Sequence, residues 1–180
     1  YGHHRVYNSR LAEASIIGTC IGLARTGFVP IGEIQFGAYM TPAITQLKEQ
    51  LATLRWRSGG NDSAGMVVVI NSQSRLDGVG GPGHGEFITG EIARIPGLRH
   101  VFPAHAAEAG PLMREAIRMA RENNEPVVYV IPINRTNADT GPYQGPNAYL
   151  PIGEAEVLAT GSDVLVLTYS NNVPVVMEAS

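Results

Sequence analysis

The sequence contains a single cysteine and no long apolar segment. Cys20 is the only cysteine among 180 residues, which excludes an internal disulfide and is typical of a reducing compartment. No stretch approaches the roughly 18 consecutive apolar residues that a membrane-spanning helix needs. The first residues, YGHHR, do not resemble a signal peptide. We therefore expect a protein of the cytoplasm, or of the mitochondrial matrix in a eukaryote, that does not enter a membrane.

Charged residues are also scarce. They make up 16% of the chain against 44% hydrophobic residues, the formal net charge is −3, and there is no basic run. The absence of a basic patch excludes a typical nucleic-acid-binding protein. The apolar content suffices for a packed core. With so few charges to cover the surface, we expect some faces of this chain to meet other chains.

The histidines do not form a metal-binding pattern. There are five in the chain, and none is spaced with cysteines or acidic residues as in common metal sites. The sequence therefore predicts no metal site made by this chain alone.

Apolar residues alternate along the chain between helix-like and strand-like spacing. Short β-branched runs such as MVVVI (66–70) and VVYVI (127–131) are typical of strands buried on both faces. Thr41 and Pro42 resemble an N-cap followed by a proline at the first helical position. Alternating strands and helices of these lengths predict an α/β fold, a parallel sheet flanked by helices. We expect helices over 13–27, 41–58 and 106–122, and strands over 29–36, 66–70, 98–102 and 127–131.

The composition changes after the last of these strands. Residues 134–148 are rich in Asn, Thr, Gly, Pro and Asp, which indicates a linker. Beyond it, residues 156–158 and 164–168 resemble strands, and the apolar segment 173–177 has no evident packing partner. We therefore predict a first domain over 1–133, a linker over 134–148, and the interrupted start of a second α/β domain over 149–180.

Two segments are candidates for chemistry. The glycine-rich stretch over 78–85 lacks the lysine and hydroxyl of a phosphate-binding loop, and Pro82 removes a backbone donor, so an active-site or surface loop is the better interpretation. His84 in that loop is either functional or simply solvated. Glu13 is either an ordinary acid at a helix N-terminus or, among apolar neighbours, a poorly solvated carboxylate with raised proton affinity. Cys20 lies on an apolar helix face and is expected in the core.

Five segments, taken together and in order, resemble one family. The segment over 30–39 is similar to the family's PIAEIQFADY, and the segment over 55–60 to its YRYRSGG. The family is the beta subunit of the thiamine-diphosphate-dependent 2-oxoacid dehydrogenases, which act on pyruvate, branched-chain oxoacids or acetoin. The matching segments are RVYNSRLAE (5–13), PIGEIQFGAY (30–39), RWRSGG (55–60), IPGLR with VFP (95–99 and 101–103), and LPIGEAEV with GSDV (150–157 and 161–164).

The resemblance implies a transketolase-like pyrimidine-binding domain and gives roles to several residues. Glu13 would be the carboxylate that bonds the ring nitrogen of the cofactor's aminopyrimidine. Leu11, Gln35 and Tyr39 would line the pyrimidine pocket, with Tyr39 stacking on the ring, and Phe36 would either shape that wall or belong to the core.

The resemblance also implies a role for His84 and a set of partners. His84 would help to bind the oxoacid or to receive the lipoyl group. Thiamine diphosphate would be the cofactor, with its Mg²⁺ held mainly by a partner subunit. The implied partners are an alpha subunit in a heterotetramer, a second beta subunit and the lipoyl acyltransferase core of a multienzyme complex. The implied reaction is an oxidoreductase step, the oxidative decarboxylation of a 2-oxoacid.

Some features depart from the family and leave alternatives open. Residues 84–87 are HGEF where the family has HSQS, and together with Asp77 and Gly78 they lean towards 1-deoxyxylulose-5-phosphate synthase and the transketolases. The altered loop also suits a non-catalytic relative that acts as a scaffold. Compared with the family, the chain is expected to lack an N-terminal segment and most of the C-terminal domain.

Overall fold

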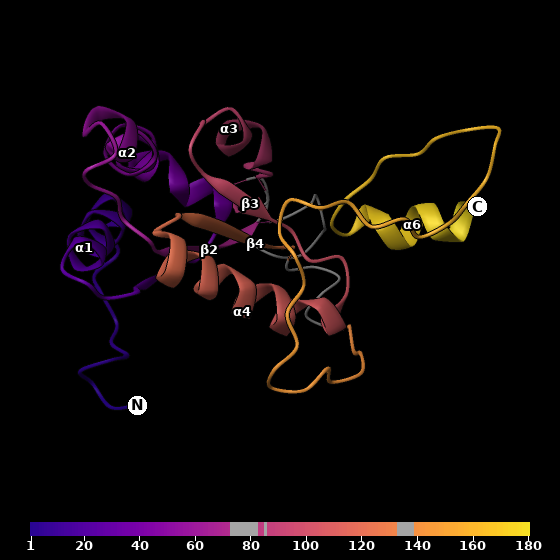
Figure 1. The fold of residues 1–180 in the computed structure, drawn as a ribbon, viewed down its shortest axis with the longest axis horizontal. Helices are drawn as coiled ribbons and strands as arrows, with labels where there is room; N and C mark the ends of the chain where they lie inside the picture. Colours follow the sequence, from indigo (N-terminus) through magenta and orange to yellow (C-terminus); the bar gives the residue numbers. More distant parts are fainter. Residues whose placement is uncertain (73–82, 85, 133–138) are drawn as a thin grey trace.

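The fold is built on a four-stranded parallel sheet (Figure 1). The computed structural model describes residues 1–72, 83–84, 86–132 and 139–180. In this part of the chain the strands lie in the order β1-β2-β4-β3 and every pair is parallel. The predicted α/β fold with a parallel sheet is confirmed. The strands are β1 (Ile31–Ile34), β2 (Val67–Ser72), β3 (Arg99–Val101) and β4 (Val127–Pro132).

The two central strands, β2 and β4, are buried on both faces of the sheet. Val68 and Ile70 contribute to one core cluster, while Val67 and Val69 contribute to a second cluster on the opposite face. The residues of β4 divide in the same way. Successive side chains of a strand point to opposite faces, so a continuous β-branched run satisfies both cores at once.

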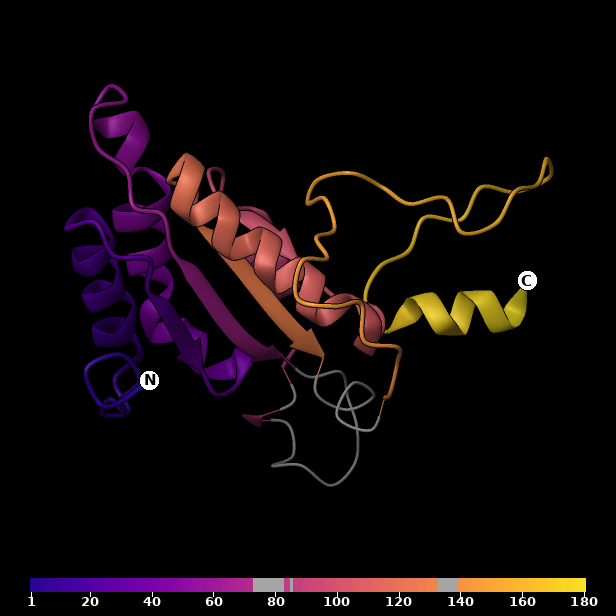
Figure 2. The same cartoon turned by 60° about the horizontal axis from the view of Figure 1, so that its bottom comes forward.

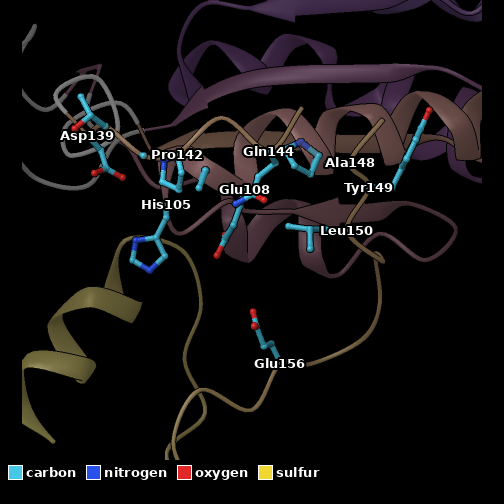
Figure 3. Close-up of a pocket in the computed structure, with 13 residues that line it drawn as sticks. His105, Glu108, Asp139, Pro142, Gln144, Ala148, Tyr149, Leu150 and Glu156 are labelled. Atoms are coloured by element: carbon cyan, nitrogen blue, oxygen red, sulfur yellow. The ribbon is translucent and has the colours of Figure 1, made fainter. Parts of the chain in front are cut away.

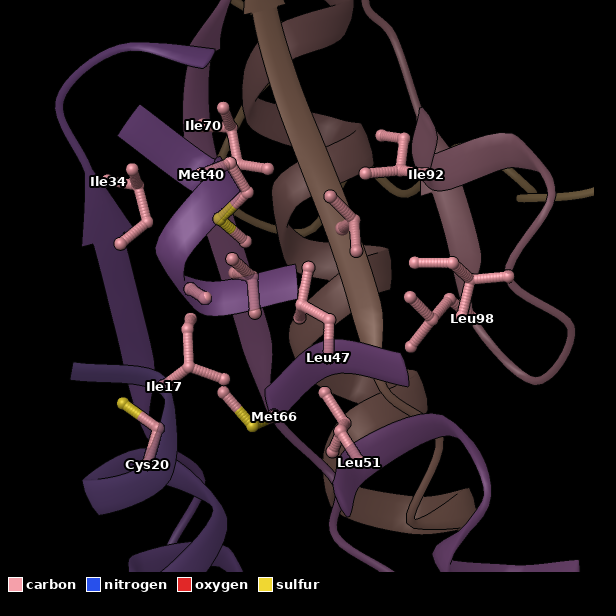
Figure 4. Close-up of a cluster of buried hydrophobic side chains, with 14 of the residues drawn as sticks. Ile17, Cys20, Ile34, Met40, Leu47, Leu51, Met66, Ile70, Ile92 and Leu98 are labelled. Carbon is pink, nitrogen blue, oxygen red and sulfur yellow. The ribbon is translucent and has the colours of Figure 1, made fainter. Parts of the chain in front are cut away.

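One face of the sheet is covered by α1 (Glu13–Arg25) and by the helical segments that follow β1. These segments are a 3₁₀ helix, η1 (Gly37–Ala43), a π-helix, η2 (Gln46–Ala52), and a short helix, α2 (Leu54–Arg57). Short α3 (Thr89–Ala93) adds Ile92 to the same core. Figure 4 shows how Ile17, Met40 and Leu47 from these elements converge on the central strands.

Cys20 belongs to this core, as the sequence predicted. It is 7% exposed, and burial raises the pKa of its thiol, so the thiol stays neutral. A Cβ on Gly32 of β1 would lie 2.9 Å from the Cys20 sulfur. Cys20 therefore fills the space between α1 and the first strand.

The opposite face is covered by α4 (Ala106–Asn123), which lies across the sheet (Figures 1 and 2). Inside this layer the Tyr129 hydroxyl of β4 donates a 2.8 Å hydrogen bond to the Ala109 carbonyl, and burial raises the pKa of Tyr129. The helix ends at Asn124, which adopts a left-handed conformation with φ of 52°. The helix expected over 106–122 is confirmed.

The helix expected to begin at Thr41 is wrong in its start and its type. The chain enters η1 directly after extended Phe36, Pro42 lies inside η1, and the Thr41 hydroxyl donates to the Ala38 carbonyl instead of capping a helix. Met40 and Ala43 are both fully buried. A spacing of three residues suits the tighter 3₁₀ turn, which places both side chains on the core side. Packing against α1 thus decides the local helix type.

The strands expected over 156–158 and 164–168 are also absent from the structure, which describes all of these residues without regular secondary structure. Leu165 and Leu167 are 83% and 84% exposed. A strand needs a neighbour for its backbone N–H and C=O groups, and these segments extend away from the sheet (Figure 1). The apolar segment 173–177 forms part of a helix, α6 (Asn172–Ala179), and Val173 is buried.

None of the helices in the described residues is long and apolar enough to cross a membrane.

Gly65, two residues before the start of β2, provides a test of how tightly α4 packs on the sheet. A Cβ at this position would lie 1.9 Å from the Ala120 carbonyl oxygen, so the helix backbone must move if a side chain is added. We expect Gly65→Ala to lower the free energy of unfolding by about 1–3 kcal/mol or more, measured by denaturant titration.

Gly90 in α3 is the matched control. Nothing lies within 4 Å of the position of its missing Cβ, so Gly90→Ala should leave the unfolding midpoint unchanged or raise it slightly. Equal effects of the two substitutions would contradict the close contact between α4 and the start of β2.

Candidate active site

The carboxyl ends of the parallel strands meet at one edge of the sheet, and the predicted site residues come from this edge. α1 is joined to β1 by the short connection 26–30 and runs in the opposite direction, so its N-terminus lies beside the carboxyl end of β1. Figure 2 shows α1 and α4 beginning at the edge to which the strand arrows point. In open parallel sheets this edge is where ligands bind.

An aromatic and imidazole cluster forms between the segment that leaves β1 and the segment that carries His84. Its members are Phe36, Tyr39 and His84, and all three side chains are half-buried. The Tyr39 hydroxyl oxygen lies 2.7 Å from His84 Nε2. The ring centroids of Phe36 and His84 are 4.8 Å apart and those of Tyr39 and His84 are 5.4 Å apart, both edge to face. The fold therefore joins Tyr39 and His84, which the sequence predicted separately.

The backbone next to His84 is anchored on the sheet edge. Ser72, the last residue of β2, is 1% exposed, and its hydroxyl donates a 3.3 Å hydrogen bond to the Glu86 carbonyl. A Cβ on Gly37 would lie 3.1 Å from that same carbonyl oxygen and 3.4 Å from Ile88 Cγ2. Gly37 thus allows the segment carrying His84 to cross close above the start of η1, and Ile88 fixes it in the core.

Glu13 is the first residue of α1 and is half-buried. The poorly solvated environment expected from its apolar neighbours is therefore only partial in this chain. α1 packs against η1, the segment that carries Tyr39. The carboxylate stands at the same sheet edge as the aromatic cluster.

The other two residues predicted to line the pyrimidine pocket, Leu11 and Gln35, are exposed to solvent in this chain. Leu11 is 77% exposed, and Gln35 is exposed as well. Most of the glycine-rich stretch over 78–85, namely residues 78–82 and 85, lies outside the described residues. Sequence reasoning missed Ser72 and Gly37, since a serine at the end of a strand and a glycine after one carry no signal of what will cross above them.

A separate cavity of about 490 Å³ lies at the N-terminus of α4 (Figure 3). It is lined by α4 and by residues 139–156, with the Glu108 and Glu156 carboxylates extending towards each other. Asp139 accepts a 2.8 Å hydrogen bond from the Ala106 backbone N–H, and Arg114 donates to the Ala148 carbonyl at 2.7 Å. These contacts fasten the linker to α4, and none of the predicted site residues lines the cavity.

Within residues 1–72, 83–84, 86–132 and 139–180, no group of three or more His, Cys, Asp or Glu side chains could hold a metal ion. The described part of the chain therefore offers a half-buried aromatic and imidazole cluster, and a half-buried carboxylate at the same edge of the sheet.

A parallel sheet covered on both faces, with a half-buried carboxylate and aromatic rings at its carboxyl edge, defines an α/β domain with a candidate ligand site at that edge. Residues 1–137 match the family described as "Transketolase, pyrimidine binding domain". The chain belongs to this family, and the resemblance to a transketolase-like pyrimidine-binding domain is confirmed.

The chain is similar to beta subunits of 2-oxoacid dehydrogenases from several organisms. The chain is 38% identical to "2-oxoisovalerate dehydrogenase subunit beta, mitochondrial" of Chaetomium thermophilum, over 94% of this chain and 35% of the relative. It is 34% identical to "3-methyl-2-oxobutanoate dehydrogenase subunit beta" of Mycobacterium tuberculosis, over 100% of this chain and 50% of the relative. The resemblance to beta subunits is confirmed, and the deoxyxylulose-phosphate synthase or transketolase alternative is not favoured. The chain spans about half the length, or less, of these relatives.

A solved structure from Mycobacterium smegmatis, described as that of a candidate thiamin diphosphate-dependent enzyme, has a similar fold. The TM-score is 0.51 at 19% identity, over 79% of this chain and 26% of the other. This likeness supports the fold.

The anchor between Ser72 and Glu86 can be tested directly. Ser72→Ala removes a buried hydroxyl and leaves the Glu86 carbonyl without its donor, which should lower the free energy of unfolding by about 0.5–1.5 kcal/mol. We also expect faster amide hydrogen exchange in residues 86–88. In the control Ser162→Ala, the exposed Ser162 hydroxyl donates to the neighbouring Asp163 carboxylate, so neither quantity should change. Unchanged exchange in Ser72→Ala would contradict the anchoring role.

Proposed function

We propose that this chain supplies the pyrimidine-binding side of a thiamine diphosphate site in the beta subunit of a 2-oxoacid dehydrogenase. The observation that carries the proposal is the meeting of Tyr39, Phe36 and His84 at the same sheet edge as the half-buried carboxylate of Glu13. The names of the similar beta subunits point to the same class of reaction. The proposed activity is the oxidative decarboxylation of a 2-oxoacid, with acyl transfer to a lipoyl group.

The residues fit the chemistry of an aminopyrimidine. A flat heteroaromatic ring needs an aromatic surface, which Tyr39 and Phe36 provide, and a polar group that bonds its ring nitrogen, which Glu13 provides. When bound, the cofactor supplies an electron sink for the carbanion that decarboxylation generates. Mg²⁺ would accompany the diphosphate.

Glu13 holds a proton at the ring nitrogen of the pyrimidine in this proposal. A carboxylate can do so only where water does not compete for the proton, so we infer that the cofactor and a partner chain complete its burial. The same surfaces would cover Leu11 and Gln35, which are exposed in the chain alone. His84 would bind the oxoacid or receive the lipoyl group at the reacting end.

The diphosphate and its metal ion need a second chain. Among the described residues no cluster of acidic and histidine side chains could hold a metal ion. We assign that half of the site to an alpha subunit. The two alpha and two beta subunits would form a heterotetramer, which docks on a lipoyl acyltransferase core.

Within this chain we assign residues 1–133 to the pyrimidine-binding domain, residues 134–148 to the linker, and residues 149–180 to the start of a second domain. The complex would work in the cytoplasm or, in a eukaryote, in the mitochondrial matrix.

The role of Glu13 predicts a large and specific loss of activity. In the protein assembled with its partner subunit, Glu13→Gln should lower the decarboxylation rate by about 10²–10⁴-fold, because a positioned proton-transfer group is lost. Thermal unfolding should be unchanged. Glu49→Gln, at an exposed carboxylate paired with Lys48, is the control and should keep full activity. Turnover of Glu13→Gln near that of the wild type would refute the assignment.

The division of the site between two chains predicts that this chain does not act alone. The purified protein, with thiamine diphosphate and Mg²⁺ but without a partner subunit, should release no carbon dioxide from 3-methyl-2-oxobutanoate or pyruvate. Adding the partner should restore release. Decarboxylation by the isolated chain would show that its own residues bind the diphosphate.

A further inference from the structure

The hydroxyl and the ring of Tyr39 make different contacts. The ring belongs to the proposed pyrimidine pocket, and it also makes an edge contact with Phe36 at 5.6 Å between centroids. The hydroxyl does not contribute to an aromatic surface. It lies 2.7 Å from Nε2 of His84, a residue 45 positions further along the chain.

This hydrogen bond has a preferred direction. A neutral imidazole has one nitrogen that accepts and one that donates, whereas a phenol can do either. The imidazole nitrogen is much more basic than a phenol oxygen, and the phenol is the stronger acid of the two neutral donors. The stronger hydrogen bond is therefore the one in which the Tyr39 hydroxyl donates and His84 Nε2 accepts. The proton of the neutral ring then lies on Nδ1.

The surroundings hold the imidazole in this orientation. Phe36 meets the His84 ring edge to face, with an interplanar angle of 86°, and the Tyr39 ring meets it at 62°, beside the hydrogen bond at Nε2. Both partners are half-buried, and the low local dielectric strengthens the hydrogen bond. The backbone on the far side of Gly85 is fastened through Ser72 and the Glu86 carbonyl.

We propose that Tyr39 is a positioning residue for His84: its hydroxyl selects the Nδ1–H tautomer, so that neutral His84 donates hydrogen bonds only through Nδ1. The groups that His84 would meet in the proposed function, an oxoacid carboxylate or a lipoyl-bound acyl carbonyl, are both acceptors. One residue would thus serve two steps, the ring of Tyr39 in cofactor binding and its hydroxyl in the step that uses His84. The contact of His84 with an oxoacid or acyl group rests on the proposed function. The selection of the tautomer by the Tyr39 hydroxyl does not.

The tautomer of His84 can be measured without an activity assay. With isotope-labelled histidine, the vibrational spectrum of the imidazole ring distinguishes Nδ1–H from Nε2–H, and the wild-type spectrum minus that of His84→Gln isolates His84. We expect an Nδ1–H signal in the wild type and its loss in Tyr39→Phe. Tyr143→Phe, which removes the hydroxyl of a tyrosine that is 78% exposed, should leave the His84 signal unchanged. An unchanged His84 signal in Tyr39→Phe, or an Nε2–H signal in the wild type, overturns the inference.

Kinetics test whether Tyr39 acts through His84. In the assembled protein, with 3-methyl-2-oxobutanoate as the probe oxoacid, Tyr39→Phe should lower the rate of acyl transfer to free lipoamide by about 10-fold, the effect of one lost hydrogen bond. Its effect on thiamine diphosphate affinity should be smaller, because the ring remains. In a His84→Gln background the same substitution should have almost no further effect on transfer. A full 10-fold loss in that background would overturn the coupling.

The two tests separate this inference from the proposed function. If the wild-type protein shows no oxoacid activity but the tautomer changes in Tyr39→Phe, the proposed function fails and the positioning of His84 by Tyr39 stands. If activity is present and the tautomer does not change, the proposed function stands and the inference fails.

Discussion

The parallel pairing of β2 with β4 is the interaction on which the rest of the structure depends. Val67 pairs with Val127 and the register continues to Ser72 and Pro132. Both strands are flanked by a further strand, β1 or β3, so their backbone groups have partners on both sides. Because their side chains alternate between two apolar cores, this pair creates the two surfaces on which α1 with its neighbours and α4 pack.

The same pairing determines where chemistry can occur. Parallel strands end at a common edge, and the segments that leave this edge are free of the core's packing constraints. Phe36 and Tyr39 follow β1 immediately, while Ser72 at the end of β2 holds the segment that carries His84. A rigid sheet thus positions side chains from distant parts of the sequence to within 2.7 Å of each other.

The candidate site is open in the chain taken alone. Glu13 is only half-buried, and Leu11 and Gln35 are exposed, whereas the role proposed for Glu13, holding a proton at a cofactor nitrogen, would need a site without water. The low charge content agrees with surfaces that other chains cover, and so do the exposed apolar residues of the segment over 157–167. In the proposed function a second chain would complete this site, which agrees with both its exposure and the composition.

The sequence by itself determined the four strands of the sheet, the two long helices α1 and α4, and the family. A short β-branched run such as MVVVI is typical of a buried strand. The spacing of apolar residues that predicts the helices α1 and α4 depends only on near neighbours in the chain. Tertiary structure decided the rest. The 3₁₀ turn at Met40 and Ala43 follows from packing against α1, and the segments over 156–158 and 164–168 lack the neighbouring strand that their backbone needs. The bond between Tyr39 and His84 joins residues 45 positions apart, and no local pattern encodes such a contact, because the crossing of the chain over Gly37 creates it.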